Sequence, residues 1–275
     1  MRVYCDTNVL RYFSSAFATG ELPQRIRENV VVSSISAVEL LSQLCESSAN
    51  QAFAAVQSLI NWLPERVPLL DLPPIFIRLN TLERDERGDA TFEKISNALN
   101  WCLRVRSPEE LRDASKELRN FLQNAKLADA QARADSVTMM RADLRRLKRR
   151  NLTDEELRVG FRASIAKRAG IDPTHPGVTI FAEKVEAFYQ YETIRLQRAI
   201  ENLNLNLLSK KRQNDLFDAE QLLYLFAENL CFLTCDRGYS ELLKLAQGTR
   251  IRIAKPDALM TANSAIPILN EIVAA

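Results

Sequence analysis

The chain has 275 residues, of which 47% are hydrophobic and 26% are charged, and its formal net charge is +2 with a pI near 8.3. Such a composition is typical of a globular protein with a sizeable core in one or two domains. The net charge is too small to indicate nucleic-acid binding by itself, so any such binding has to come from a local cluster of charge.

Cysteine usage and hydropathy indicate the compartment. The five cysteines are odd in number and form no Cys-x-x-Cys pair, which predicts neither a disulfide framework nor a zinc knuckle. They are expected to be small buried hydrophobic residues in a reducing cytosol. Met1 leads directly into the first predicted strand, and no apolar run is long enough to span a membrane. We therefore expect a cytoplasmic protein with no signal peptide and no membrane association.

The chain has a single histidine, His175, between Pro173 and Pro176 in a predicted solvated loop. A site with two histidines is therefore excluded, and a Ser-His-Asp triad would have to use His175. Any catalysis is expected to use carboxylates and a metal ion.

Two stretches near opposite ends of the chain have the same design. Residues 2–10, with the sequence RVYCDTNVL, predict a short buried strand that ends at Asp6. Residues 231–239 repeat an apolar run, a threonine (Thr234), an aspartate (Asp236) and a glycine turn into a helix. Asp6 alone is more typical of a helix N-cap or a turn. Because ligands bind beyond the carboxyl ends of parallel strands, the pair predicts a closed acidic site.

The other elements near the two ends complete an α/β pattern. Strands are predicted over residues 29–34, 67–70 and 250–254, and helices over 34–41, 51–63, 214–225 and 240–246. Ser36 and Glu39 have the spacing of a capping box, so a structural role for Glu39 stays open beside a functional one. This order predicts a doubly wound parallel sheet, flanked by helices, from residues 1–75 and 213–275.

The intervening residues 76–212 predict a large, all-helical insertion, because Ala, Leu, Glu, Lys and Arg dominate and strand-like runs are rare. Helices are predicted over 76–104, 109–127, 129–150, 154–169 and 178–208. The basic segment 141–150 is either a solvated helix face or a surface that contacts phosphates. The candidate nucleic-acid-binding residues are Arg145, Arg146, Lys148, Arg149 and Arg150.

The helix predicted over 214–225 begins with Asp215 and Asp218, one turn apart. Acidic residues at this end of a helix complement the macrodipole, which is the structural alternative to a functional role. Carboxylates gathered in one site repel one another unless a cation compensates them, and Mg²⁺ and Mn²⁺ prefer oxygen ligands. Such an ion can activate water for attack on a phosphodiester.

At this point the residues resemble the PIN-domain ribonucleases. The similarity covers residues 1–75 and 213–265 and rests on Asp6-Thr7-Asn8, Glu39, Asp218 and Leu233-Thr234-x-Asp236. It implies a PIN-like fold and a metal-dependent nuclease, usually acting on RNA, with DNA as the other substrate. It further implies Asp6, Glu39, Asp218 and Asp236 as catalytic and metal-binding residues, with Mg²⁺ or Mn²⁺. The supporting polar residues would be Thr7, Asn8, Asp215 and Thr234.

Small toxin-type members of that family lack an insertion of this size, a departure that argues against carrying over a toxin role with a paired antitoxin. The protein partners considered are a second copy of the chain, in a homo-oligomer, and an antitoxin-like protein. Haloacid-dehalogenase phosphatases need Asp-x-Asp, but the second position here is Asn8. A receiver domain or a glycine-rich phosphate loop is not indicated. The alternative from another functional class is a module with a degenerate site that binds nucleic acid or protein. The full set of four acidic candidates favours the enzyme.

Overall fold

The structure is a computed structural model that describes residues 1–17, 22–45, 49–62, 69–83, 107–148, 152–209 and 215–275. Within these residues the chain forms two compact units. The first comprises Met1–Leu72, Gly88–Phe121 and Ala227–Ala275, and the second comprises Pro73–Arg87 and Leu122–Phe226.

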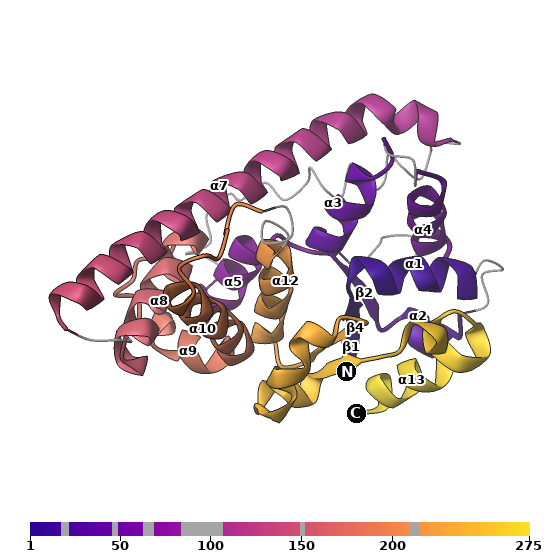
Figure 1. The fold of residues 1–275 in the computed structure, drawn as a ribbon. Coiled ribbons are helices and arrows are strands. Elements are labelled where there is room, and N and C mark those ends of the chain that lie inside the picture. The colour runs from indigo at the N-terminus through magenta and orange to yellow at the C-terminus, as the bar shows by residue number, and fades with distance from the viewer. Residues whose placement is uncertain (18–21, 46–48, 63–68, 84–106, 149–151, 210–214) are drawn as a thin grey trace. The chain divides into compact units, whose positions relative to one another are not determined.

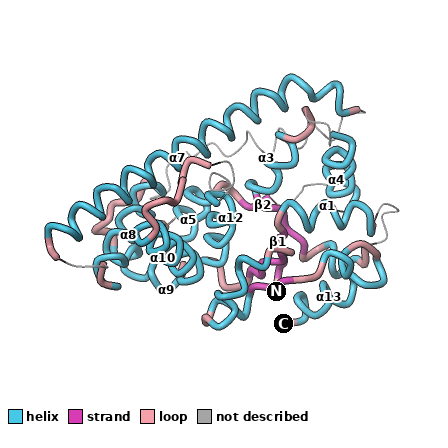
Figure 2. The backbone as a smooth tube through the Cα atoms, viewed as in Figure 1, coloured by secondary structure: helices cyan, strands magenta, loops and turns pink. Residues whose placement is uncertain are grey.

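The first unit is built on a parallel five-stranded sheet, so the predicted α/β class is confirmed (Figure 2). Its strand order is β3-β2-β1-β4-β5, and every neighbouring pair is parallel. The strands are β1 (Arg2–Cys5), β2 (Val30–Ser33), β3 (Leu69–Leu70), β4 (Leu230–Thr234) and β5 (Ile251–Ile253). The predicted pairing of the two Asp-ended strands is confirmed, because β1 lies beside β4.

Successive side chains along β1 and β4 point to opposite faces of the sheet. On one face Tyr4 stacks on Phe232 with ring centroids 5.0 Å apart, and Tyr239 meets Phe232 edge-on at 5.4 Å. On the other face Val3 and Cys231 belong to the main apolar core. Helices α1 (Thr7–Ala16), α4 (Ala49–Trp62) and α13 (Ala262–Ala274) are among the elements that complete that core (Figure 1).

Shorter elements complete this unit. They are α2 (Gln24–Arg27), α3 (Ser34–Ser42) and the 3₁₀ helices η1 (Pro108–Leu111), η4 (Arg237–Lys244), η5 (Gln247–Arg250) and η6 (Pro256–Leu259). The helix predicted over 240–246 is therefore a 3₁₀ helix that begins three residues earlier, directly after Asp236. The N-terminal ammonium group donates to the carbonyl of Val273 at 3.0 Å, where a positive charge complements the C-terminal end of α13.

In its described part, the second unit contains helices and no strand. Its elements are α5 (Pro73–Thr81), α8 (Asp154–Ala169), α9 (Phe181–Lys184), α10 (Glu186–Glu201), α12 (Asp215–Gln221), η2 (Pro176–Ile180) and η3 (Leu222–Phe226), with α7 (Arg112–Arg146) from Leu122 onward. The helical character predicted for 76–212 is thus confirmed for its described residues. Residues 84–106, 149–151 and 210–212 of that prediction lie outside them.

Several helix boundaries differ from the sequence-based prediction. The helix expected over 76–104 is α5, which begins at Pro73 and ends at Thr81, and the one expected over 178–208 is divided into η2, α9 and α10. Residues 109–127 and 129–150 were expected as two helices, but α7 is continuous from Arg112 to Arg146, because its Ala-rich middle has no Gly or Pro to end it. Helix α10 ends at Glu201. There the Arg141 guanidinium donates to the last carbonyls of α10, including Ile200 at 3.1 Å and Asn202 at 3.0 Å. The helix over 154–169 is confirmed, with the Thr153–Glu156 capping box at its start. None of the described helices is both long and apolar enough to cross a membrane.

Candidate functional site

The register of β1 and β4 places Asp6 beside Thr234. Cys5 lies opposite Leu233, so the next residue of each strand lies at the same edge of the sheet. The Thr234 hydroxyl donates to Oδ2 of Asp6 at 2.5 Å and accepts from the backbone N–H of Asp236 at 2.9 Å. The strand order reverses between β1 and β4, which is the switch point where open α/β sheets bind ligands.

Both aspartates also begin helices. Oδ1 of Asp6 accepts from the backbone N–H of Val9 at 2.8 Å as the N-cap of α1, so the N-cap alternative for Asp6 is confirmed. Oδ1 of Asp236 accepts from Gly238 N–H at 2.7 Å as the N-cap of η4. A carboxylate oxygen has two lone pairs, so these bonds leave each aspartate with acceptor capacity for a further ligand.

Glu39 lies on α3 and accepts from the Thr7 hydroxyl at 2.6 Å through Oε2. The capping box predicted for Ser36 and Glu39 is wrong, because Ser33 is the N-cap and accepts from Ser36 N–H at 3.1 Å. The helix begins one residue after β2, which turns Glu39 toward Thr7 of α1 instead of toward its own N-terminus. Glu39 therefore does not cap its own helix, which was the structural alternative to a functional role.

Ser36 has a role that the sequence did not indicate. Its hydroxyl donates to the carbonyl of Cys5 at 2.9 Å and accepts from the Ser33 hydroxyl at 2.9 Å. Both serines are fully buried. They fix the last residue of β1, and hence Asp6, to the start of α3. The one sequence feature that could have indicated this role is the cluster of serines in residues 33–36, at the junction of strand and helix.

A second polar contact joins α1 and α3 one helical turn further along. The Arg11 guanidinium donates to the side chain of Gln43, four residues after the Thr7–Glu39 pair on both helices. The buried Nε of Arg11 makes no hydrogen bond within the described residues. This contact was not predicted, because nothing in the sequence shows that the two helices lie side by side.

Burial dominates the electrostatics of Asp6. Loss of water raises the pKa of its carboxyl group, the hydrogen bonds from Thr234 and Val9 lower it, and the nearby charge of Glu39 raises it, with a net upward shift. Burial, together with the Asp6 charge, raises the pKa of the Cys235 thiol to about 12. Cys235 is thus held as a neutral thiol beside the site at neutral pH.

The remaining predicted site residues lie elsewhere or outside the description. Asn8 is exposed on the first turn of α1. Asp218 belongs to the second unit, where it is half-buried on α12. Asp215 begins α12, but its side chain lies outside the described residues. The structure therefore brings together Asp6, Thr7, Glu39, Thr234 and Asp236.

The candidate nucleic-acid surface lies at the C-terminal end of α7. Arg145, Arg146 and Lys148 are exposed, whereas Arg149 and Arg150 lie outside the described residues. Arg146 pairs with Asp143 at 3.1 Å, and both side chains are mostly exposed. Exposed pairs of this kind are weak, so the arginine remains available to a phosphate.

Among the described residues, no group of three or more acidic, cysteine or histidine side chains is close enough to hold a metal ion as the side chains stand. Hydroxyl and backbone donors hold the carboxylates in their present directions. The donors of the cluster are oxygen atoms of carboxylates and hydroxyls, the chemistry that suits Mg²⁺ and Mn²⁺. Comparison with family models, with curated proteins and with solved structures finds no match to this chain.

Proposed function

We propose that this protein is a metal-dependent nuclease, acting on RNA or, as the second substrate class, on DNA. The observation that supports it best is the hydroxyl-linked pair of Asp6 and Asp236 beside Glu39 at the switch point of the sheet. Carboxylates placed there are where an open α/β protein binds a ligand. The nearby charge of Glu39 raises the pKa of Asp6, and this repulsion favours a cation over a neutral ligand.

In this proposal Asp6, Glu39 and Asp236 hold a divalent cation, Mg²⁺ or Mn²⁺. When bound, the cation would supply a water of lowered pKa and stabilise charge on the phosphate oxygens. Thr234 orients the Asp6 carboxylate by donating to Oδ2, and Thr7 orients Glu39 in the same way. The sequence-based assignment of Asp218 to the same metal stays a prediction.

The substrate phosphates would be contacted by Arg145, Arg146 and Lys148 at the exposed end of α7. Such contacts supply sequence-independent affinity that falls as salt is raised. Arg141 is not assigned to the phosphate-contacting group, because its guanidinium donates to the carbonyls of Ile200 and Asn202 at the end of α10.

A degenerate module that binds nucleic acid without cutting it is the second candidate. It is favoured by one observation: as N-caps, Asp6 and Asp236 have structural roles that need no metal. The two candidates differ in whether binding and cleavage depend on a divalent cation.

The test is cleavage of labelled RNA and DNA with Mn²⁺ or Mg²⁺, comparing the wild-type protein with Asp6→Asn. The variant keeps the size of the side chain, so we expect a folded protein with cleavage reduced by about 100-fold or more. Asp257→Asn, an exposed aspartate of η6, is the matched control and should cleave normally. Cleavage that survives EDTA, or a wild-type rate for Asp6→Asn, would show the nuclease proposal to be wrong. Binding without cleavage in any cation would favour the module.

A further inference from the structure

The second unit contains an open pocket of about 540 Å³ that the proposed nuclease site does not use. It is lined by residues of α7, α8 and α10, together with Ala219 of α12. This volume lies within the range of small-molecule sites, which combine apolar walls with a few placed polar groups.

Gly160 is one of the residues that line this pocket, and the space beside its Cα is open. Gly160 lies in the interior of α8, and a Cβ built there would meet no atom within 4 Å. A glycine in the middle of a helix is less favourable than alanine by about 0.5–1 kcal/mol. No packing requirement explains the glycine, so the space beside it is the feature that a larger side chain would remove.

Aromatic rings belong to the apolar part of the lining, beside aliphatic side chains such as Leu157 and Leu196. The Phe161 ring lies 5.1 Å from that of Phe188 and 5.2 Å from that of Tyr189, measured between centroids. The Tyr189 hydroxyl donates to Oδ1 of Asp154 at 2.6 Å, which fixes the ring in place. Rigid rings of this kind offer apolar contact at low conformational cost.

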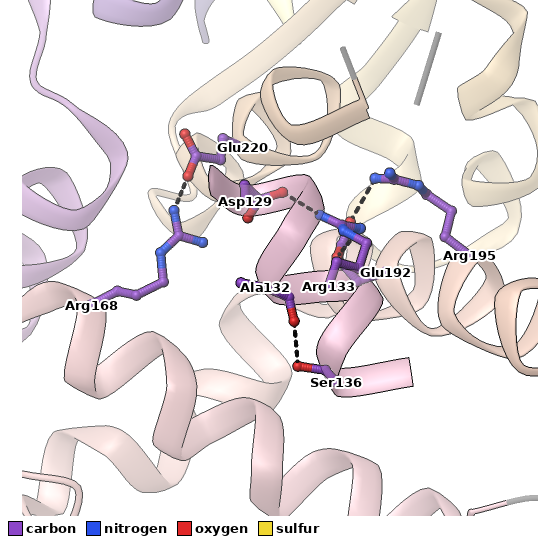
Figure 3. A network of polar contacts seen from close by, with 8 residues as sticks. All are labelled: Asp129, Ala132, Arg133, Ser136, Arg168, Glu192, Arg195 and Glu220. Carbon is purple, nitrogen blue, oxygen red and sulfur yellow. Dashed lines mark hydrogen bonds and ion pairs between the residues drawn. The ribbon is translucent and has the colours of Figure 1, made fainter. Parts of the chain in front are cut away.

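Charged groups form the polar wall, and they differ in how fully they are paired (Figure 3). Arg133 donates to Asp129 at 3.0 Å and to Glu192 at 2.8 Å, so its guanidinium joins two carboxylates. Arg168 pairs with Glu220 alone among the described residues, and 40% of its side-chain surface stays exposed. A guanidinium has five N–H donors, so Arg168 can bind a further acceptor in the pocket.

The charge of Arg168 is under-compensated where it lies. Loss of water lowers its pKa, Asp129 and Glu192 oppose this, and Arg133 adds to it, leaving the pKa below its usual value. An anionic group next to Arg168 would offset that cost, whereas an ammonium group would add to it.

We propose that this pocket binds a small organic anion, with an apolar body against Phe161, whose ring packs on the buried Phe188 and Tyr189, and a carboxylate on Arg168. The ligand class follows from the guanidinium with spare donors and the fixed rings that line the same pocket. Carboxylate and guanidinium match in geometry and form charge-assisted hydrogen bonds.

The test is calorimetric titration of the full chain with 2-naphthoate, beside its neutral analogue 2-naphthalenemethanol. We expect saturable binding of one naphthoate, at least about tenfold tighter than the alcohol, and an increase in the melting temperature. Gly160→Leu should fill the pocket and abolish binding while the helix stays intact. Gly160→Ala, the matched control, should bind naphthoate and melt at a higher temperature than the wild type.

Arg168→Gln should weaken naphthoate binding by about tenfold and leave the alcohol unchanged, a difference that a merely structural arginine would not produce. Lys167→Gln, an exposed change on the same helix, should alter neither. If Arg168→Gln fails to fold, Arg168→Lys keeps the charge and should retain the preference for the anion. Failure of naphthoate to bind in the millimolar range, equal binding of the alcohol, or unchanged binding by Gly160→Leu would each overturn the proposal.

Discussion

The two units of this protein hold their half-buried carboxylates in opposite ways. In the first unit Asp6 accepts from neutral donors, the Thr234 hydroxyl and the Val9 N–H. In the second unit Glu192 accepts from two guanidinium groups, those of Arg133 and Arg195, each at 2.8 Å (Figure 3).

The consequences for charge differ accordingly. Burial raises the pKa of Asp6, and its hydrogen bonds reverse this shift only in part. Burial lowers the pKa of Arg133, but Glu192 and Asp129 outweigh it and the net shift is upward. The comparison teaches that neutral dipoles orient a carboxylate without neutralising it, whereas ion pairs compensate charge inside the protein. A site that is to receive a cation needs the first arrangement.

The largest effect should come from breaking the compensated network. Glu192→Gln removes the acceptor charge shared by Arg133 and Arg195, whose side chains are 19% and 12% exposed. We expect a loss of about 2–4 kcal/mol in the free energy of unfolding, because two largely buried guanidinium groups lose the charge of Glu192, although Arg133 keeps its pairing with Asp129. Urea unfolding measures it, with the exposed Glu183→Gln as the control. A loss no greater than that of the control would show that this network adds little to stability.

A smaller effect should come from removing the Ser36 hydroxyl, which holds Cys5, the residue before Asp6. Ser36→Ala leaves the Cys5 carbonyl without its side-chain donor in a fully buried setting, at a cost of about 1–3 kcal/mol. Ser14→Ala is the control, since among the described residues the Ser14 hydroxyl donates to the local carbonyl of Arg11 within α1 and to no other element. Ser36→Ala should also reduce cleavage if the proposed site depends on the position of Asp6. Equal losses for both serines would mean that the junction of β1 and α3 tolerates the change.

The smallest effect should be a gain. Because the pKa of Asp6 is raised in the folded state, its ionised form is disfavoured there, and Asp6→Asn should be slightly more stable than wild type at pH 7 without metal. Because the pKa of Asp6 is higher in the folded state, the folded wild-type protein takes up a proton on Asp6 at a higher pH than the unfolded chain does, and this uptake stabilises the wild type as the pH falls. The advantage of the variant should therefore shrink between pH 7 and about pH 4, the range that ends at the ordinary aspartate pKa.

Melting temperatures of both proteins across this pH range, with EDTA present, measure the effect. Added Mn²⁺ should reverse the order at pH 7 if Asp6 holds the cation, because a ligand of the folded state stabilises it. A variant that is less stable than wild type at every pH would show that the hydrogen bonds of the ionised Asp6 outweigh its burial.

Local sequence patterns predicted much of the first unit. The apolar runs at 2–5 and 231–235 predicted strands, observed as β1 and β4, and the Asp that follows each run predicted the edge where they end. In the second unit, the helix predicted over 154–169 is α8, with a capping box at Thr153 and a left-handed Gly170 at its end. These predictions hold because they depend on interactions within a few residues.

Other features could not be predicted, because they depend on which elements become neighbours. Ser33 replaces Ser36 as N-cap since the helix begins directly after β2, and Glu39 consequently meets Thr7 of another helix. The 3₁₀ form of residues 237–244 was likewise missed. In these cases the local signals were compatible with two arrangements, and packing decided between them.

By itself, the sequence determined the alternation of strands and helices at the two ends, the helical character of the described part of 76–212, and the presence of aspartates after β1 and β4. Only the tertiary structure decided that Thr234 links those two aspartates, because the link depends on the parallel register of strands more than 200 residues apart along the chain. It likewise decided that Arg133 and Glu192, on different helices, meet in one network. Hydrophobic periodicity reports which face of an element is buried, but contacts between polar side chains of distant elements follow from register and packing, which local sequence does not encode.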